Sequence, residues 1–180
     1  MIRDDAWIIS DTHFGHAKII EYAGRPFKSV PEMDEIIIEN WNKRVDKKDQ
    51  VVFLGDFAFA NAEITKIYRK RLNGEIIMIM GNHDRHRSIS WWQNHGFIVF
   101  PYPIVYKNNF ILSHEPVDWI TGKYPLLNIH GHEHEKTAYN ISNHHYNVSV
   151  EAAHYLPLRL HDVIQEGRNR SDGFVEKESL

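Results

Sequence analysis

The sequence predicts an α/β fold, with a parallel sheet in the first half of the chain and a second sheet packed on it. In the first half, short apolar runs alternate with segments of helical periodicity, the pattern of parallel strands joined by helical crossovers. In the second half, short apolar runs follow one another with tight connections, as strands do. The 180 residues show no repeat and no linker, so we expect one domain over residues 1–165 and a polar tail over residues 166–180.

Three buried strands and three helices are expected in the first half. The strands are Ala6–Ser10, Val51–Leu54 and Glu75–Met80. The helices are Ala17–Ala23, a segment that begins after Ser29, and Ala62–Leu72. Ser29 and Glu32 have the spacing of a capping box, and apolar side chains follow at helical intervals, at Met33, Ile36, Ile37 and Trp41.

The second half is expected to consist mostly of strands. They are Phe97–Phe100, Ile104–Lys107, Phe110–Ser113, Leu126–Ile129 and Tyr146–Val150. The segment KNNF, Lys107–Phe110, has the composition of a hairpin turn. Leu158–Gln165 predicts a final helix, and the polar residues from Glu166 onward predict a frayed end.

Composition excludes several kinds of protein and site. No cysteine is present, so disulfides and thiolate metal sites are impossible, and a reducing, cytoplasmic location is expected. The net charge of −3 gives no reason to expect an extended nucleic-acid surface. The N-terminal apolar run predicts a strand rather than a signal peptide, and no run approaches the roughly 18 residues of a membrane helix. The 13 histidines are the unusual feature.

Short polar motifs follow five of the expected strands. They are SDTHFGH, LGDF, GNHD, ILSHEP and IHGHEH, in chain order. Taken singly, each has an ordinary interpretation, such as a turn for Asp56 or a satisfied, partly buried histidine for His114. In α/β sheets, however, sites gather at the carboxyl ends of strands. Five strand ends that bring acids, an amide and imidazoles to one edge therefore indicate a metal site.

In this order, the motifs resemble the pattern of the calcineurin-like metallophosphoesterase family. That pattern is D-x-H, G-D, G-N-H-D or G-N-H-E, a lone histidine and G-H-x-H, and every block is present between Asp11 and His134. The segments DTHFGH, RPF and EMD further resemble a small single-domain subgroup. The resemblance implies a two-sheet β-sandwich flanked by α-helices, in four layers α-β-β-α, with a two-metal site at one edge.

The resemblance also implies the ligands of two divalent metal ions. One ion would be held by Asp11, His13, Asp56 and His134, and the other by Asp56, Asn82, His114 and His132. Asp56 would bridge them, with one carboxylate oxygen for each ion at the roughly 3.5–4 Å spacing of two-metal hydrolases. Manganese is the expected ion, and iron, zinc, nickel and cobalt suit the same ligands.

His83 has no metal in this scheme and is implied as the general acid. Asp84 would fix its ring and raise its basicity, or would cap the segment that follows. Phe14 and His16 flank the first ligand motif and could line the substrate pocket. Arg25 could contact a phosphate or lie on the surface.

Two further features leave alternatives open. The loop 115–125, which carries Trp119 and Tyr124, could form a lid over the site. His130 precedes the GHEH motif and is either a packed core histidine or a support for the ligands.

The implied reaction is hydrolysis of phosphate mono- or diesters of small molecules, nucleotides in particular, by a hydroxide that bridges the two ions. The closest alternative is a nuclease or nucleic-acid-end phosphatase of the same fold, and the lack of a basic stripe counts against it. The third hypothesis is a non-catalytic metal-binding scaffold. The complete set of ligands, together with His83, counts against this hypothesis. The oligomeric state is left open.

Overall fold

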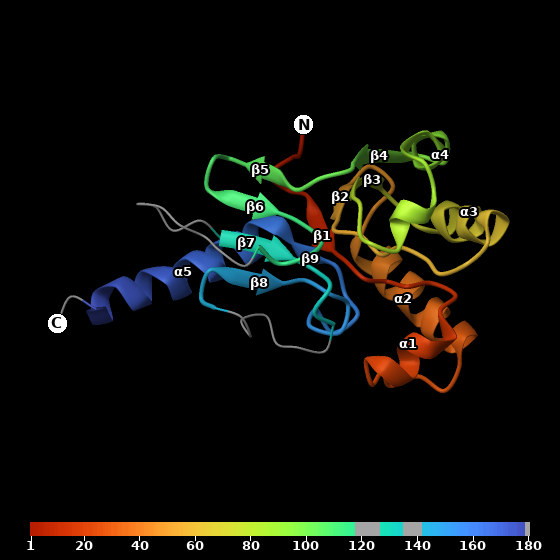
Figure 1. The fold of residues 1–180 in the computed structure, drawn as a ribbon, viewed down its shortest axis with the longest axis horizontal. Helices are drawn as coiled ribbons and strands as arrows, with labels where there is room; N and C mark the ends of the chain where they lie inside the picture. The colour runs from red at the N-terminus through yellow and green to blue at the C-terminus, as the bar shows by residue number, and fades with distance from the viewer. Residues whose placement is uncertain (118–126, 135–141, 179–180) are drawn as a thin grey trace.

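The computed structural model describes residues 1–117, 127–134 and 142–178 and places them in two mixed β-sheets flanked by helices (Figure 1). Sheet one has the order β4-β3-β2-β1-β9. Its strands are β1 (Trp7–Ile9), β2 (Gln50–Phe53), β3 (Glu75–Ile79), β4 (Phe97–Phe100) and β9 (Leu158–Arg159). The first four run parallel, and β9 is antiparallel to β1. The predicted α/β fold is confirmed.

Helical crossovers join the parallel strands, because parallel neighbours need a connection that returns along the sheet. They are α1 (Ala17–Tyr22) and α2 (Val30–Arg44) before β2, α3 (Ala62–Arg71) before β3, and the 3₁₀ turn η1 (Asp84–His86) with α4 (Ile89–Asn94) before β4. Ser29 caps α2 as its spacing predicted, by accepting a hydrogen bond from the Glu32 backbone N–H. The sequence pattern did not predict α4, which Ser88 caps and whose Trp92 is buried.

Sheet two has the order β5-β6-β7-β8. Its strands are β5 (Ile104–Tyr106), β6 (Phe110–Leu112), β7 (Leu127–His130) and β8 (His145–Asn147). The KNNF segment forms the predicted hairpin turn between the antiparallel strands β5 and β6, while β6, β7 and β8 run parallel. The strand expected to reach Val150 ends at Asn147, because Ser149 leaves sheet two and pairs with Ser10 beyond β1.

Two apolar clusters cover the opposite faces of sheet one. Alternate residues of a strand face opposite sides, so Trp7 and Ile9 join the cluster beneath the helices and Ile8 joins the cluster between the sheets. Trp41 of α2 and Trp92 of α4 are fully buried in the first cluster. In Figure 1, α1 to α4 lie on the side of sheet one that faces away from sheet two. Both faces of the central strands are thus packed, which fixes the strand ends in place.

The C-terminal helix α5 (Leu160–Glu178) is longer than the sequence predicts. Leu160 and Val163 join the cluster between the sheets. Farther along, the Glu166 carboxylate accepts a hydrogen bond from Tyr146, and Gly167 packs so closely on the Leu127 side chain that a Cβ atom there would displace it. These contacts continue the helix past Gln165, where polar composition alone predicts fraying. Within the described segments, no helix combines the length and the apolar composition that a membrane span requires.

Candidate metal centre

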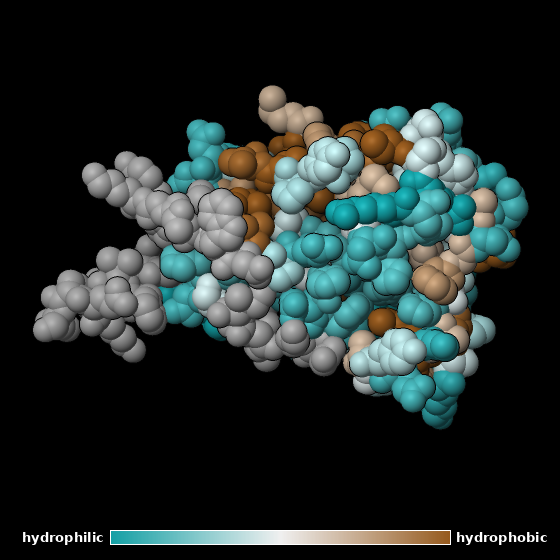
Figure 2. Space-filling view, in the orientation of Figure 1, coloured by the Kyte–Doolittle hydropathy of each residue, from teal (hydrophilic) through white to brown (hydrophobic). Residues whose placement is uncertain are grey.

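The predicted site residues follow the carboxyl ends of strands from both sheets. Figure 2 shows hydrophilic residues gathered over the ends of β7 and β8. Backbone hydrogen bonds tie the loops together: the Asp11 N–H donates to the Gly55 carbonyl, and the His13 N–H donates to the Asp56 carbonyl. The Ser10–Ser149 bridge joins the two sheets at the same edge. The sandwich therefore brings together motifs that lie far apart in the sequence.

Two groups of side chains have the spacing of metal ligands. The first is Asp11, His13 and His134, and the second is Asp56, His114 and His132, with ligand atoms within 4.8 Å of one another in each group. Asn82 joins the second group, because its Oδ1 lies 2.9 Å from His114 Nε2. Asp56 Oδ2 lies 3.5 Å from His13 Nε2 and 3.4 Å from His114 Nε2, and so stands between the two groups.

Each aspartate has one oxygen held by the protein and one that faces the site. Asp11 Oδ2 accepts hydrogen bonds from Ser10 Oγ, Ser149 Oγ and the His132 N–H, at 2.5, 3.0 and 2.9 Å. Asp11 Oδ1 is buried and has no hydrogen-bond partner among the described residues. Asp56 Oδ1 accepts from the His83 N–H at 2.9 Å. Only Oδ2 of Asp56 therefore faces both groups, whereas the sequence argument gave each ion its own oxygen.

The histidines are oriented with a ring nitrogen toward the site. His114 Nδ1 lies 2.8 Å from the Leu54 carbonyl and His134 Nδ1 lies 3.2 Å from Glu151 Oε1, so in both rings Nδ1 donates and Nε2 is the nitrogen left to hold a metal. Both nitrogens of the buried His13 ring are without a hydrogen-bond partner in the described part of the chain. Burial holds the pKa of His13 well below its usual value, so the ring is neutral, the form that binds metals.

The charges of the site fit cations. Burial disfavours a charge on His114, but the hydrogen bond to Asp56 and the negative charges of Asp11 and Asp56 outweigh it and raise the pKa of His114 to about 9. The two buried acids thus stabilise a positive charge at this place. Carboxylate, imidazole and amide ligands are those that divalent transition metals prefer. The donor set and its unpartnered buried atoms therefore fit two divalent ions.

The backbone around the site is unusually constrained. Five predicted ligands have a left-handed backbone, with φ of 59° at Asp11, 47° at His13, 59° at Asp56, 68° at His132 and 41° at His134. Non-glycine residues adopt this conformation at a cost, and such residues cluster at functional sites. Gly81 and Gly131 lie against the Asp56 and Asp11 carboxylates, where a Cβ atom would collide with them.

Asp84 does not contact the His83 ring, which corrects the first of its two predicted roles. Its buried carboxylate accepts hydrogen bonds from the backbone N–H groups of Asp56, Phe57 and Gly81, at 2.7, 3.0 and 2.9 Å. Burial, and then the negative charge of Asp56, raise the pKa of Asp84 to about 6. Asp84 thus joins the loop after β2 to the loop after β3, and the His83 ring instead packs edge-on against His13, at a centroid distance of 5.4 Å.

Two of the three predicted substrate contacts are buried. Phe14 is fully buried between Phe57 and Tyr68, so it packs in the core and lines no pocket. The Arg25 side chain is also fully buried, and its guanidinium donates to the backbone carbonyls of Asp11 and Thr12 instead of facing a phosphate. His16 alone is partly exposed, with its ring 5.4 Å from that of His13.

Glu151 is a supporting residue that the sequence argument missed. Its Oε1 accepts a hydrogen bond from Arg25 Nε at 2.8 Å and lies 3.2 Å from His134 Nδ1. Arg25 and Glu151 therefore connect the loop of Asp11 to the ring of His134. No local pattern predicts this pair, because its members lie 126 positions apart and Glu151 belongs to none of the quoted motifs.

His130 and the predicted lid have different outcomes. His130 is buried, its Nδ1 lies 2.8 Å from the Gly131 carbonyl, and its ring packs edge-on against His145. Burial lowers the pKa of His130 to about 4, so it is a neutral packed histidine beside the site. Most of the proposed lid, including Trp119 and Tyr124, lies outside the described residues.

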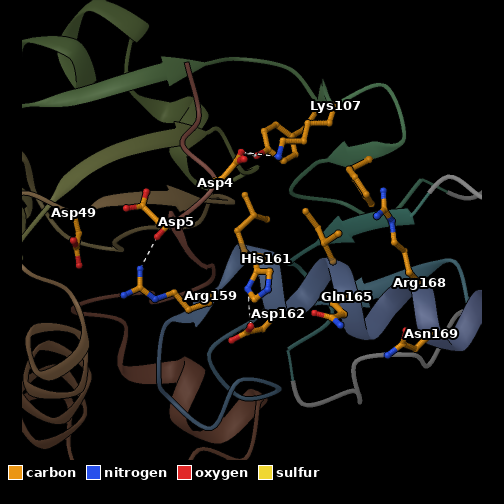
Figure 3. Close-up of a pocket in the computed structure, with 14 residues that line it drawn as sticks. Asp4, Asp5, Asp49, Lys107, Arg159, His161, Asp162, Gln165, Arg168 and Asn169 are labelled. Atoms are coloured by element: carbon orange, nitrogen blue, oxygen red, sulfur yellow. Dashed lines mark hydrogen bonds and ion pairs between the residues drawn. The ribbon is translucent and has the colours of Figure 1, made fainter.

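A hollow of about 990 Å³ lies away from this site, next to α5 and the β5–β6 hairpin (Figure 3). Its charged groups contact one another: Lys107 Nζ lies 2.6 Å from Asp4, and His161 Nδ1 lies 2.7 Å from Asp162. Arg159 donates to the Asp5 carbonyl. None of the predicted site residues lines it, so its volume does not make it the active site.

The chain is similar to a family model and to several known proteins. The family model described as calcineurin-like phosphoesterase matches residues 6–173. Uncharacterized protein MJ1445 of Methanocaldococcus jannaschii is 39% identical over 166 residues, which cover 88% of this chain and 89% of that protein. Gene 66 protein of Mycobacterium phage D29 is 34% identical over 93 residues, 45% of this chain and 41% of that protein. The solved structure of the protein of unknown function AQ665 from Aquifex aeolicus matches with a TM-score of 0.62 and 27% identity, over 89% of this chain and 97% of that one.

Proposed function

This chain belongs to the calcineurin-like phosphoesterase family, whose members are metal-dependent phosphoric ester hydrolases, and from that premise we propose that it hydrolyses mono- or diesters of small phosphorylated molecules, nucleotides above all, at a centre of two divalent ions. When bound, two such ions activate a water molecule and neutralise charge on the phosphoryl oxygens. The position of Asp56 Oδ2 between the two ligand groups is the single observation that carries the proposal.

The charge of the ligand set suits an anionic substrate. Asp11 and Asp56 are the only carboxylates in the two groups, and the other predicted ligands are neutral imidazoles and an amide. Two acids leave a net positive charge on two divalent ions, which attracts a phosphate, whereas a site with four or five carboxylates would repel it. Manganese remains the ion that we expect to support activity.

His83 is the proton donor in this proposal, and three observations support that role. Its backbone N–H is held by Asp56, its ring is partly exposed, and it lies beside the predicted ligand Asn82. A general acid contributes about 10²–10⁴-fold when the departing oxygen is strongly basic. His83→Ala should therefore slow hydrolysis of an alkyl or nucleoside ester far more than that of a p-nitrophenyl ester, with metal content unchanged. Equal losses on both esters would assign His83 to phosphate binding.

The proposed activity is tested by metal analysis and turnover in the same preparations. Manganese-loaded protein is assayed on p-nitrophenyl phosphate, bis-p-nitrophenyl phosphate and a panel of nucleotides, and the preferred ester separates a monoesterase from a diesterase. About two ions per chain are expected. Asp56→Asn should remove activity and weaken the binding of both ions, since it alters the ligand that they share. Near-normal turnover of this variant would disprove the shared centre, and an inert wild-type protein with two bound ions would favour the scaffold alternative.

A further inference from the structure

A hollow of about 530 Å³ opens beside the candidate metal centre. The residues that line it are Phe59, Ala60, Asn61, Asn82, His83 and His86. Two of them belong to the proposed site, Asn82 as a ligand and His83 as the proton donor. A molecule bound at the metal centre with its leaving group toward His83 therefore extends into this hollow.

Phe59 is the large apolar side chain of the hollow, and 53% of it is exposed. Its backbone is fixed, because the Phe59 N–H donates to the Phe14 carbonyl at 2.9 Å next to the Phe14–Ala58 bridge. The part of the ring that faces water lacks the free energy that burial would provide. That free energy becomes available to a ligand that covers the ring.

Two neighbouring rings pack on Phe59, which also lines the hollow. The His16 ring stacks on Phe59 at a centroid distance of 4.4 Å and an interplanar angle of 24°, and the His83 ring meets Phe59 edge-on at 5.7 Å. His16 in turn lies 5.4 Å from His13. A row of rings thus leads from a predicted metal ligand to the exposed phenyl group.

The lining also indicates the charge of the ligand. It consists of a phenyl ring, a methyl group, two amides and two imidazoles, with no lysine, arginine or carboxylate. A second phosphate would find no cationic side chain in that lining, whereas an uncharged planar ring would find an aromatic surface and amide groups. The volume is in the range of about 300–1,000 Å³ that is usual for small-molecule pockets.

We propose that this hollow binds a planar aromatic part of the substrate, a nucleobase or an aryl group, stacked on Phe59, and that Phe59 determines the preference for such substrates. The inference rests on the proposed function for the position of the phosphate. The hollow itself would bind the aromatic group whether or not hydrolysis follows.

The test compares Phe59→Leu, which keeps apolar bulk and removes the ring, with the wild-type enzyme. Substrates are used in matched pairs: adenosine monophosphate with ribose phosphate or, for a diesterase, adenosine cyclic phosphate with glycerol cyclic phosphate. Base stacking on an aromatic side chain is worth about 1–3 kcal/mol, which corresponds to about 5- to 150-fold. KM for the base-bearing member should rise by a factor in that range, with kcat and the base-free member changed less than about twofold. Tyr102→Leu removes another exposed ring, which does not line the hollow. It should leave KM and kcat unchanged for both members of each pair.

A binding measurement separates this inference from the proposed function. Adenosine, which has no phosphate, is titrated into protein loaded with zinc, a diamagnetic ion, and the ring resonances of Phe59 and His16 are followed by NMR. Adenosine-induced shifts of His16 that are lost in Phe59→Leu support the hollow even if no ester is cleaved. Equal decreases in kcat/KM for both members of a substrate pair would overturn the assignment of Phe59. Unchanged kinetics of Phe59→Leu together with no adenosine binding to the wild-type protein would overturn it as well.

Discussion

The left-handed backbone at five predicted ligands shows how the site is built at the scale of single residues. Each such residue costs about 1 kcal/mol or more, which together is a large part of the 5–15 kcal/mol by which domains are usually stable. Hydrogen bonds hold these loops in place, as with the Asp11 and His13 N–H groups, which donate to the Gly55 and Asp56 carbonyls. Metal binding to the folded site would offset part of this strain, because its free energy adds to that of folding.

The pair of Arg25 and Glu151 is expected to act on metal affinity through His134. Groups that orient a ligand typically change affinity by 10–100-fold when removed. Glu151→Gln should therefore weaken the binding of one of the two ions by about 10-fold and leave the affinity for the other nearly unchanged. Competition with a chelator measures both affinities. It should also lower stability, because it leaves the buried Arg25 without its carboxylate.

Glu35→Gln is the matched control for this prediction. Glu35 also pairs with an arginine, Arg71, but both side chains are exposed and far from the ligands in the sequence. Exposed pairs contribute about 0–1 kcal/mol, so stability and both affinities should stay close to those of the wild-type protein. If Glu151→Gln also left both metal affinities unchanged, the Arg25–Glu151 pair would be a purely structural contact.

At the scale of the elements, the strand-end loops depend on glycines that allow close approach. A Cβ at position 131 would collide with the Asp11 carboxylate and the Ser10 hydroxyl. We therefore expect Gly131→Ala to lower metal content and activity together. Gly24→Ala is the control, since Gly24 has a left-handed φ of 58° but open space around it. It should cost about 1 kcal/mol in urea unfolding and retain its metals. Full metal content in Gly131→Ala would show that the loop can adjust.

The elements also show which parts of the structure the sequence could predict. Apolar runs located β1, β2 and β3 and the polar motifs after them, because burial and strand ends have a local signature. The capping of α2 and the KNNF turn are local as well. The length of α5 depends on Gly167 packing against Leu127, and the buried state of Phe14 and Arg25 depends on distant partners. Contacts between distant segments leave no periodic trace in the chain, so these features could not be predicted.

At the scale of the whole molecule, the candidate centre connects the two sheets. Asp11, His13 and Asp56 follow strands of sheet one, whereas His114, His132 and His134 follow strands of sheet two. Bound ions would therefore stabilise the packing of one sheet against the other as well as the local loops. Binding to the native state alone stabilises it by about 4 kcal/mol at a ligand concentration 1,000 times the Kd.

Removal of the metals should accordingly lower the thermal stability of the entire domain. For a chain of this size, about 4 kcal/mol corresponds to a decrease in Tm on the order of 10 °C, measured by calorimetry with and without a chelator. Manganese should restore both Tm and activity. A chelator that abolishes activity and leaves Tm unchanged would show that the ions bind without holding the sheets together.

The division of the ligands between the two halves of the chain has a consequence for biosynthesis. A ribosome releases Asp11, His13 and Asp56 first, so the growing chain carries acids and an imidazole while His114, His132 and His134 are still unmade. A nascent chain at that stage offers any metal an incomplete and weak set of ligands. Tight metal uptake would therefore be confined to chains that have been translated past His134 and folded, and a product truncated before His132 should be left without its metals.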